Sequence, residues 1–296
     1  MRILITGGTG FVGAALKQFL LTQGHEVVIL SRSGGDFQWD VSYGYIDPAA
    51  FEGVDAIVHL AGAGIAEERW SAARKRELVN SRVRSTAVLY QALSTIPHSI
   101  KTVVSASAIG YYGADTGEAE CVETSPVGLD FLADCTKQWE EAVDQIATLG
   151  IRLAKVRIGL VMGAEGGIFP VISKPIRWGL GANLGSGKQW QSWIHMTDLL
   201  RIFNELLINP ALSGVYNGVA PEPIRAGEMN KQIAKALHKP FFLPFIPGFL
   251  LRLVLGEMAC LVLGGSRVSS AKIEKDATFS FTFVRFEEAL KEILHV

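Results

Sequence analysis

The feature that most constrains the fold is a glycine motif at the start of the chain. Residues 3–6, Ile-Leu-Ile-Thr, predict a short buried strand, and apolar residues at helical spacing follow the glycines. In such a strand-turn-helix unit, one glycine allows a tight turn, one lets a pyrophosphate approach the backbone, and one lets the helix pack on the strand. The helix N-terminus adds partial positive charge. The motif therefore predicts a dinucleotide cradle made of Gly7, Gly8, Thr9, Gly10, Phe11, Val12 and Gly13.

A second predicted strand, Glu26 to Leu30, completes a β-α-β unit. A third, Phe37 to Asp40, follows a link of only four residues. Four residues span at most roughly 14 Å, so no crossover helix fits and a loop should cover the adenine side. Asp40 either accepts a hydrogen bond from an adenine amino group or is a solvated loop carboxylate.

Strands and helices continue to alternate up to residue 158. After the strand at 54–60, Leu60, Ala61 and Gly62 let a cofactor approach the backbone. The alternation predicts an α/β fold with a doubly wound parallel (Rossmann) sheet. We expect an NADP-binding Rossmann domain at 1–162, with return segments at about 190–220, and a smaller C-terminal α+β substrate lobe at 163–296. The further predicted elements are helices at 71–93, 131–149, 197–207, 228–237 and 286–294, and strands at 102–105 and 151–158.

Composition excludes several classes of protein. The chain has 28 basic and 29 acidic residues and no long basic run, so nucleic acid is not expected as a partner. Its three cysteines are odd in number and lack metal-ligand spacing, which favours free thiols, no metal site and a reducing, cytoplasmic location. Prolines and charges interrupt the most apolar region, Phe241 to Leu263, so no membrane span is expected. We interpret that region as a buried helix of the lobe; the alternatives are a subunit contact, which leaves a homodimer open, or a substrate lid.

The residues after the second strand favour NADP(H) over NAD(H). NAD-binding turns usually carry an acidic residue about 20 residues after the glycines. This chain has Ser31, Arg32 and Ser33 there. A guanidinium can hold a 2′-phosphate through charge-assisted hydrogen bonds, the serines can donate to it, and a carboxylate would repel it. Arg32 as an ordinary solvated residue is the alternative.

The motifs together resemble the extended short-chain dehydrogenase/reductase superfamily, to which nucleotide-sugar epimerases belong. More narrowly, the chain looks like an atypical branch of epimerase-family proteins of uncertain substrate. The superfamily motifs are 6–13, His59 to Gly62, Ser105 to Gly113, 157–159 and Trp193 to Asp198, and the marks of the branch are Arg69-Trp70, Ser81-Arg82, 110–113, Gly256-Glu257 and 261–265.

The resemblance implies a tyrosine four residues before a lysine on the helix after the fifth strand, plus an upstream serine. Only the serine, Ser107, is present. The pair is replaced by Leu132 and Thr136, or by Ala133 and Lys137 if the register shifts by one residue. By resemblance Arg82 and Glu77 face the cofactor; the alternative is an ordinary solvated helix pair.

Other groups must therefore transfer the proton if the protein is an enzyme. Tyr111 is our first candidate and Tyr112 the second, each with an aromatic packing role as the alternative, and Cys135 and Lys137 follow. By resemblance His195 belongs to a structural loop, with a catalytic base as the alternative. We regard Lys174, Arg177 and Lys188 as solvated rather than as contacts of an anionic substrate.

We expect an oxidoreductase or epimerase-like enzyme acting on a small carbonyl or hydroxyl compound, with Ser107, Tyr111 and Tyr112 as candidate catalytic residues. A non-catalytic NADP(H)-binding regulatory or redox-sensing protein is the rival hypothesis, because the usual tyrosine and lysine are missing. A nucleotide-sugar epimerase with relocated acid and base groups is the second alternative.

Overall fold

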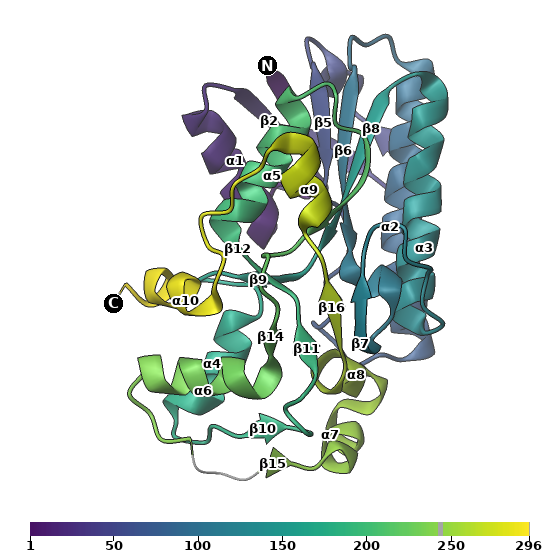
Figure 1. The fold of residues 1–296 in the computed structure, drawn as a ribbon. Coiled ribbons are helices and arrows are strands. Elements are labelled where there is room, and N and C mark those ends of the chain that lie inside the picture. Colours follow the sequence, from purple (N-terminus) through teal and green to yellow (C-terminus); the bar gives the residue numbers. More distant parts are fainter. Residues whose placement is uncertain (242–244, 296) are drawn as a thin grey trace.

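The computed structural model describes residues 1–241 and 245–295, and its centre is an eight-stranded sheet (Figure 1). The strand order is β13-β8-β6-β5-β1-β2-β3-β4, and every neighbouring pair is parallel except β3 with β4. The predicted doubly wound parallel sheet is confirmed, with a short antiparallel strand added at one edge. The strands are β1 (Arg2–Thr6), β2 (Glu26–Ser31), β3 (Phe37–Asp40), β4 (Tyr45–Ile46), β5 (Ala56–His59), β6 (Thr102–Ala108), β8 (Arg152–Ile158) and β13 (Gly214–Gly218).

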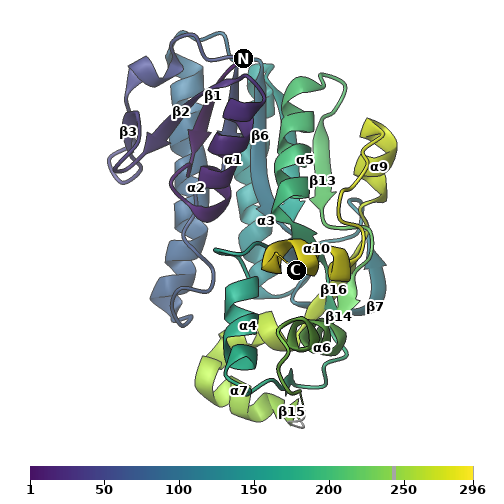
Figure 2. The ribbon, with the colours of Figure 1, turned by 90° about the vertical axis from the view of Figure 1, so that its left-hand side faces the viewer.

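Helices cover both faces of this sheet. Helices α1 (Phe11–Thr22) and α5 (Met196–Ile208) lie on one face, and α2 (Ala72–Thr95) and α3 (Phe131–Asp144) lie side by side on the other (Figures 1 and 2). Because both faces are covered, the buried parts of β1, β2 and β5 are continuous apolar runs rather than alternating ones. Side-chain caps define where α2 and α3 begin: Ser71 Oγ accepts from the Arg74 N–H, and Asp130 Oδ1 accepts from the Ala133 N–H.

The link between β2 and β3 contains no helix, as predicted. Leu30 pairs with Phe37 and Ser31 with Gln38, so the chain re-enters the sheet at once. It then turns back, because Asp40 Oδ1 accepts hydrogen bonds from the N–H groups of Ser42 and Tyr43. That turn leads into β4, which the sequence did not predict.

The second half of the chain also contributes to the large sheet. Strand β13 pairs with β8, and α5 packs beside α1. Most of the remaining helices form a smaller layer below the sheet in Figure 1 with its own apolar core, which includes Phe169, Trp193, Met229, Ile233, Phe286 and Leu290. These helices are α4 (Phe169–Arg177), α6 (Ala226–Ala236), α7 (Gly248–Leu255), α8 (Cys260–Leu263) and α10 (Phe286–Leu294). Helix α9 (Ala271–Ala277) lies instead against β13, and its Ile273 belongs to the core of the large sheet.

Four two-stranded pairs connect segments that lie far apart in the sequence. They position the loops at the carboxyl end of the large sheet. The pairs are β7 (Asp115–Cys121) with β16 (Gly265–Val268), β9 (Leu160–Met162) with β12 (Trp193–His195), β10 (Asn183–Leu184) with β15 (Phe245–Ile246), and β11 (Trp190–Gln191) with β14 (Ile224–Arg225).

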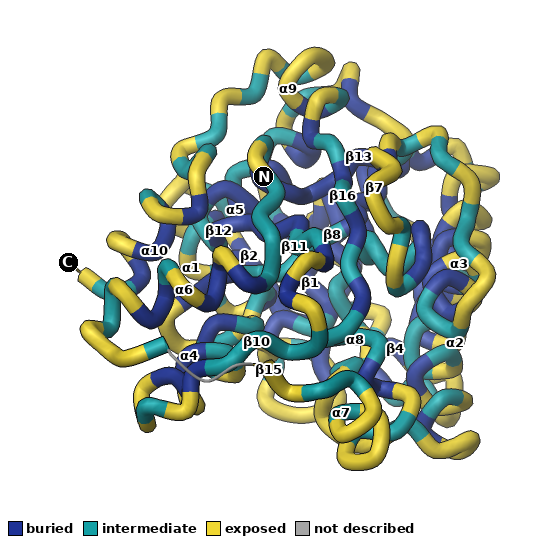
Figure 3. Tube along the Cα trace, turned by 60° about the horizontal axis from the view of Figure 1, so that its bottom comes forward, coloured by how far each residue is buried: buried dark blue, intermediate teal, exposed yellow. Residues whose placement is uncertain are grey.

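The interpretation of 241–263 as a buried helix is wrong in the part that the structure describes; residues 242–244 lie outside it. No residue of α7 is buried, and Phe249, Leu253 and Val254 are 67%, 75% and 66% exposed (Figure 3). The segment lies at the outer edge of the smaller layer, where no described element covers its apolar side. Within 1–241 and 245–295, no helix is both long enough and apolar enough to cross a membrane.

Candidate cofactor and substrate site

The three motif glycines have different surroundings. Gly7 has φ +70°, and a Cβ on it would lie 2.8 Å from the Leu60 carbonyl carbon. A Cβ on Gly13 would lie 2.3 Å from the Gly7 oxygen, so α1 rests directly on the turn. A Cβ on Gly10 would meet only the Gly7 oxygen, at 3.3 Å. Protein atoms therefore occupy the space beside Gly7 and Gly13. Gly10 borders the open side of the turn, where a pyrophosphate would lie.

The N-terminus of α1 is left without a side-chain cap. Gly10 is the N-cap residue, and the first turn holds no acidic side chain. Uncapped N–H groups and the helix dipole favour an anion at this position. Thr9 is exposed and Val12 half-buried beside the turn. The ring of Phe11 reaches the 163–167 loop, since Cβ atoms on Gly163 and Gly166 would lie within 3 Å of it. That loop therefore borders the cradle from the side of the smaller layer.

At the end of β2, Arg32 is exposed. The hydroxyl of Ser31, in contrast, donates to the Ser33 carbonyl at 2.7 Å and closes its own turn. Asp40 likewise uses Oδ1 in the turn between β3 and β4. The exposed Arg32 side chain is therefore accessible to the predicted 2′-phosphate. Ser31 and Asp40, in contrast, already form hydrogen bonds within their own turns.

A cavity of about 250 Å³ lies at the carboxyl ends of β6 and β8. This edge of a doubly wound sheet is the usual ligand-binding edge. Segments from both halves of the chain line the cavity. The lining residues are Ile65, Arg82, 108–110, 113–114, Leu132, Cys135, Thr136, Trp139, 158–160, 190–192, Cys260, Leu261 and 264–266.

Arg82 links the cofactor side to this cavity. Its Cζ and Nε lie close to Gly62, where a Cβ would meet them at 3.3 and 3.4 Å. The guanidinium lies 5.1 Å from the Trp139 ring centroid, and Nη1 donates to the Leu78 carbonyl at 2.9 Å. Burial lowers the pKa of Arg82, and the guanidinium in turn favours the thiolate of neighbouring Cys135, whose pKa burial raises. That Arg82 faces the cofactor stays a prediction.

Glu77 lies elsewhere. It forms an ion pair with Arg74 on the same helix at 2.9 Å, and the Glu77 side chain is more than half exposed. Arg74 also donates to the Gly64 carbonyl, which anchors the loop after β5. The arrangement matches the alternative we gave for Glu77, a helix surface pair.

The two registers for the expected tyrosine and lysine differ in whether their residues line the cavity. Leu132 and Thr136 both line it, whereas Ala133 is fully buried and Lys137 lies in solvent, paired with Glu141 at 3.7 Å. The Thr136 hydroxyl donates to the Leu132 carbonyl. The first of the two registers therefore fits the structure.

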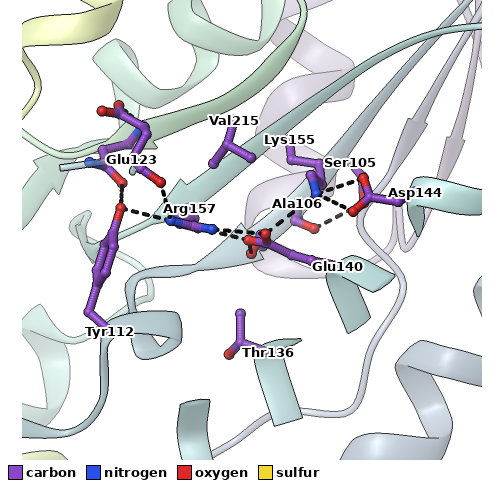
Figure 4. Close-up of polar contacts among 12 residues, drawn as sticks. Ser105, Ala106, Tyr112, Glu123, Thr136, Glu140, Asp144, Lys155, Arg157 and Val215 are labelled. Atoms are coloured by element: carbon purple, nitrogen blue, oxygen red, sulfur yellow. Dashed lines mark hydrogen bonds and ion pairs between the residues drawn. The ribbon is translucent and has the colours of Figure 1, made fainter. Parts of the chain in front are cut away.

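Ser107 and Tyr112 are buried and belong to a polar network around Glu140 and Arg157. Figure 4 shows Tyr112, Arg157 and Glu140 in this network. Ser107 Oγ donates to Glu140 Oε1 at 2.5 Å. Tyr112 donates to Asn217 at 2.7 Å and accepts from Arg157 at 3.0 Å. Burial raises the pKa of Tyr112 to about 12, against the opposing effect of Arg157. Neither side chain lines the cavity in the described chain, so this geometry opposes the predicted proton transfer by Tyr112.

Tyr111, the first candidate for the proton donor, packs its ring on Arg157, with 3.4 Å between the Arg157 Cζ and the ring centroid. It does not line the cavity either. The contact corresponds to the packing role that we gave as the alternative for this residue. Its catalytic role stays a prediction.

Glu140 is the centre of the network. It accepts from Arg157 at both carboxylate oxygens, at 2.9 and 3.0 Å, and lies 3.4 Å from the Lys155 ammonium, which also pairs with Asp144 (Figure 4). Burial alone would raise the pKa of Glu140, but the hydrogen bonds and charges of Arg157 and Lys155 outweigh it and hold the pKa low. A fixed, ionised carboxylate therefore lies between β6, β8 and α3.

The sequence reasoning missed this network, although a signal was present. Lys155 and Arg157 are two apart in a strand whose intervening residues are apolar, so both point to the same face of the sheet. Buried cations require an acidic partner, and Glu140 on the covering helix provides it. The α8 residues Cys260 and Leu261 in the cavity wall had no comparable local signal.

His195 has a structural role, in line with our assignment. Its Nε2 is 2.8 Å from Glu292 on α10, its Nδ1 accepts from the Thr197 N–H, and its ring packs on Phe283. Burial lowers the pKa of His195. Lys174 and Arg177 are exposed on α4, and neither they nor Lys188 are among the described residues that line the cavity.

Comparison with known proteins gives consistent results along the whole chain. The model of the NAD dependent epimerase/dehydratase family matches residues 3–217, and that of a domain of unknown function, DUF1731, matches residues 246–293. A chloroplastic homolog of epimerase family protein SDR39U1 from Arabidopsis thaliana is 37% identical over 313 residues, which cover 99% of this chain and 87% of the relative. Epimerase family protein YfhF from Bacillus subtilis is 32% identical, over 99% of this chain and 98% of its own.

A similar solved structure is the crystal structure of human epimerase family protein SDR39U1 (isoform 2) with NADPH. It is 34% identical to this chain, with a TM-score of 0.89, and the match covers 100% of this chain and 99% of the human one.

Proposed function

This chain belongs to the NAD dependent epimerase/dehydratase family within the extended short-chain dehydrogenase/reductase superfamily, and from that premise we propose that it binds NADP(H) and uses it on a small carbonyl or hydroxyl compound. The observation that carries the proposal is the open position at Gly10, between the packed positions at Gly7 and Gly13. The uncapped N-terminus of α1 supplies N–H donors to the diphosphate there. The human relative was solved with NADPH.

Preference for NADP(H) over NAD(H) rests on Arg32. Its exposed side chain at the end of β2 can pair with a 2′-phosphate. Calorimetric titration of Arg32→Ala with NADPH and with NADH tests this, with Arg84→Ala, an exposed arginine on α2, as the control. We expect NADPH binding to weaken about 10- to 100-fold, the value of a hydrogen bond to a charged group. NADH binding should be nearly unchanged, and equal losses for both cofactors would refute the phosphate contact.

When bound, NADPH would supply a hydride for reduction of a carbonyl to an alcohol, and solvent water would supply the proton. The chain's own residues bind and orient the substrate: Arg82 offers N–H donors to its oxygen, and the apolar side chains of the cavity wall pack against the rest of it. We assign Ser107, Tyr112 and Glu140 to positioning, since their hydrogen bonds hold the end of β6 that borders the cavity.

A second candidate function is supported by one observation. Leu132 and Thr136 line the cavity at the positions of the usual tyrosine and lysine, and a leucine cannot transfer a proton. A regulatory or redox-sensing protein would bind NADPH without turnover. A screen for NADPH oxidation with a panel of carbonyl compounds separates the two, with Arg82→Gln as the inactive control. Tight NADPH binding without oxidation by any compound would favour the binding protein.

A further inference from the structure

The side chains that line the cavity limit the kind of substrate that can bind there. We propose that the substrate is a compact and largely apolar compound with one hydrogen-bond-accepting oxygen, and that Arg82 binds this oxygen. This inference rests on the proposed function, because it concerns the ligand that lies beside NADP(H) in the same site.

The wall presents mainly hydrocarbon. Five separate segments contribute large apolar side chains to it: Ile65, Ile109, Leu132, Leu160 and Leu261. Trp139 adds a flat aromatic surface. At about 250 Å³ the cavity is also smaller than the roughly 300–1,000 Å³ common for drug-sized ligands. Its shape and surface therefore suit a small ring or short chain.

The polar side chains of the wall are already used by the protein. Thr136 donates to the Leu132 carbonyl at 2.8 Å, and Ser192 donates to the Ser266 carbonyl at 2.7 Å. Ser266 donates to the Gly113 carbonyl at 3.2 Å, and Trp190 Nε1 donates to Glu118 at 3.1 Å. Gln191 donates to the Gly264 carbonyl at 3.4 Å. These donors tie the wall together, so a ligand with several hydroxyls would leave its own polar groups unpaired.

Arg82 is the exception. It is the one charged side chain among the described residues of the wall, and only its Nη1 is used, by the Leu78 carbonyl. The guanidinium lies between Gly62 and the Trp139 ring. It can therefore donate to one oxygen at the boundary between the cofactor loop and the cavity.

These features disfavour a nucleotide sugar. Its diphosphate and sugar hydroxyls would need several cations and donors, whereas the wall offers one cation and its hydroxyls are paired. Each polar group that is buried without a partner weakens binding. An aromatic or alicyclic ketone or aldehyde has one polar group, its carbonyl oxygen. When it enters the cavity, a hydrogen bond from Arg82 replaces the one that this oxygen accepted from water.

Binding of matched probes tests the inference without turnover. The protein is saturated with NADP⁺, which cannot reduce a carbonyl, and dissociation constants are measured by ligand-observed NMR for acetophenone, ethylbenzene and UDP-glucose. We expect acetophenone to bind most tightly, and about tenfold or more better than ethylbenzene, which lacks the oxygen. In Arg82→Gln this preference for the ketone should shrink to about twofold or less, whereas in Arg84→Gln it should persist.

A general loss of structure in Arg82→Gln would weaken both aromatic probes equally, so the ratio between them isolates the contact with oxygen. Tighter binding of UDP-glucose than of acetophenone, or an unchanged ratio in Arg82→Gln, would overturn the substrate class while leaving NADP(H) binding intact. Failure of the wild type to bind NADP⁺ in the same experiment would overturn the proposed function, and this inference with it.

Discussion

At the scale of single residues, a substitution at Gly10 is expected to affect cofactor binding and to leave folding almost unchanged. A methyl group there meets only the Gly7 oxygen, at 3.3 Å, and the φ of −80° suits alanine. We expect Gly10→Ala to change the free energy of unfolding by no more than about 0.5 kcal/mol, as at an uncrowded surface site. NADPH binding should weaken about tenfold or more, because the methyl occupies the space of the pyrophosphate. Urea unfolding and calorimetric titration measure the two quantities.

Gly13→Ala is the matched contrast. Its Cβ would lie 2.3 Å from the Gly7 oxygen and 2.7 Å from the Gly8 Cα, both rigid backbone atoms, so α1 must move away from β1. We expect the free energy of unfolding to fall by about 1–3 kcal/mol or more, as for an overpacked core site. If Gly13→Ala were as stable as the wild type and Gly10→Ala were not, our assignment of the packed and open glycines would be incorrect.

His59 makes stability depend on pH. Its fully buried ring contacts the hydroxyls of Thr6 at 2.7 Å and Thr86 at 3.1 Å, and burial lowers its pKa from 6.5 to about 4. Between these values the unfolded chain binds the proton more strongly than the folded chain. The free energy of unfolding therefore falls as the pH drops from about 6.5 to 4, by about 3 kcal/mol. In His59→Gln this part of the pH dependence should disappear from urea unfolding curves; an identical slope would contradict the assignment.

At the scale of elements, the sequence predicts the helices and strands whose own residues show an apolar pattern or a helix cap. The apolar run of β5 and the Ser71 cap of α2 are local features, and both elements form where expected. Strands β7 and β16 are different, because β7 is mostly polar and exposed and its partner lies about 150 residues away. The apolar composition of α7 predicted burial, yet burial depends on what the rest of the chain places against it.

The candidate site divides in the same way. The glycine turn is a run of neighbouring residues, and Arg32 directly follows the second strand, so both could be recognised from local sequence. The cavity wall combines α3 with α8, and the two helices meet only in the folded protein. The role of Ser107 could not be read from its motif either, since its hydrogen bond goes to Glu140, 33 residues later.

The polar network between α3 and β8 predicts that removing the charge of one carboxylate, Glu140, strongly lowers the free energy of unfolding. In Glu140→Gln, Arg157 and Lys155 lose their buried partner, and breaking a buried ion pair costs about 3–5 kcal/mol. Glu141→Gln is the matched control on the same helix, because Glu141 is exposed and pairs only with Lys137. Its expected change is below about 0.5 kcal/mol. Equal urea midpoints for the two variants would show that the network does not stabilise the fold.

At the scale of the whole molecule, the two halves of the chain are interlocked. Strand β13 and helix α5, from the second half, complete the large sheet and its cover. Asp198, fully buried on α5, accepts from the backbone N–H groups of Thr282 and Phe283, which fixes the segment before α10. The smaller layer is therefore attached to the sheet by elements that belong to both.

This interlocking predicts one cooperative unfolding transition. Hydrogen exchange at increasing urea, read by mass spectrometry, should show β6 in the sheet and α6 in the smaller layer losing protection at the same urea concentration. Asp198→Asn weakens the hydrogen bonds to Thr282 and Phe283, so it should lower both midpoints together, by about 1–3 kcal/mol of unfolding free energy. Saturating NADPH should raise both, because ligand binding stabilises the whole cooperative unit. Loss of protection in α6 while β6 stays protected would instead mean that the smaller layer unfolds as a separate domain.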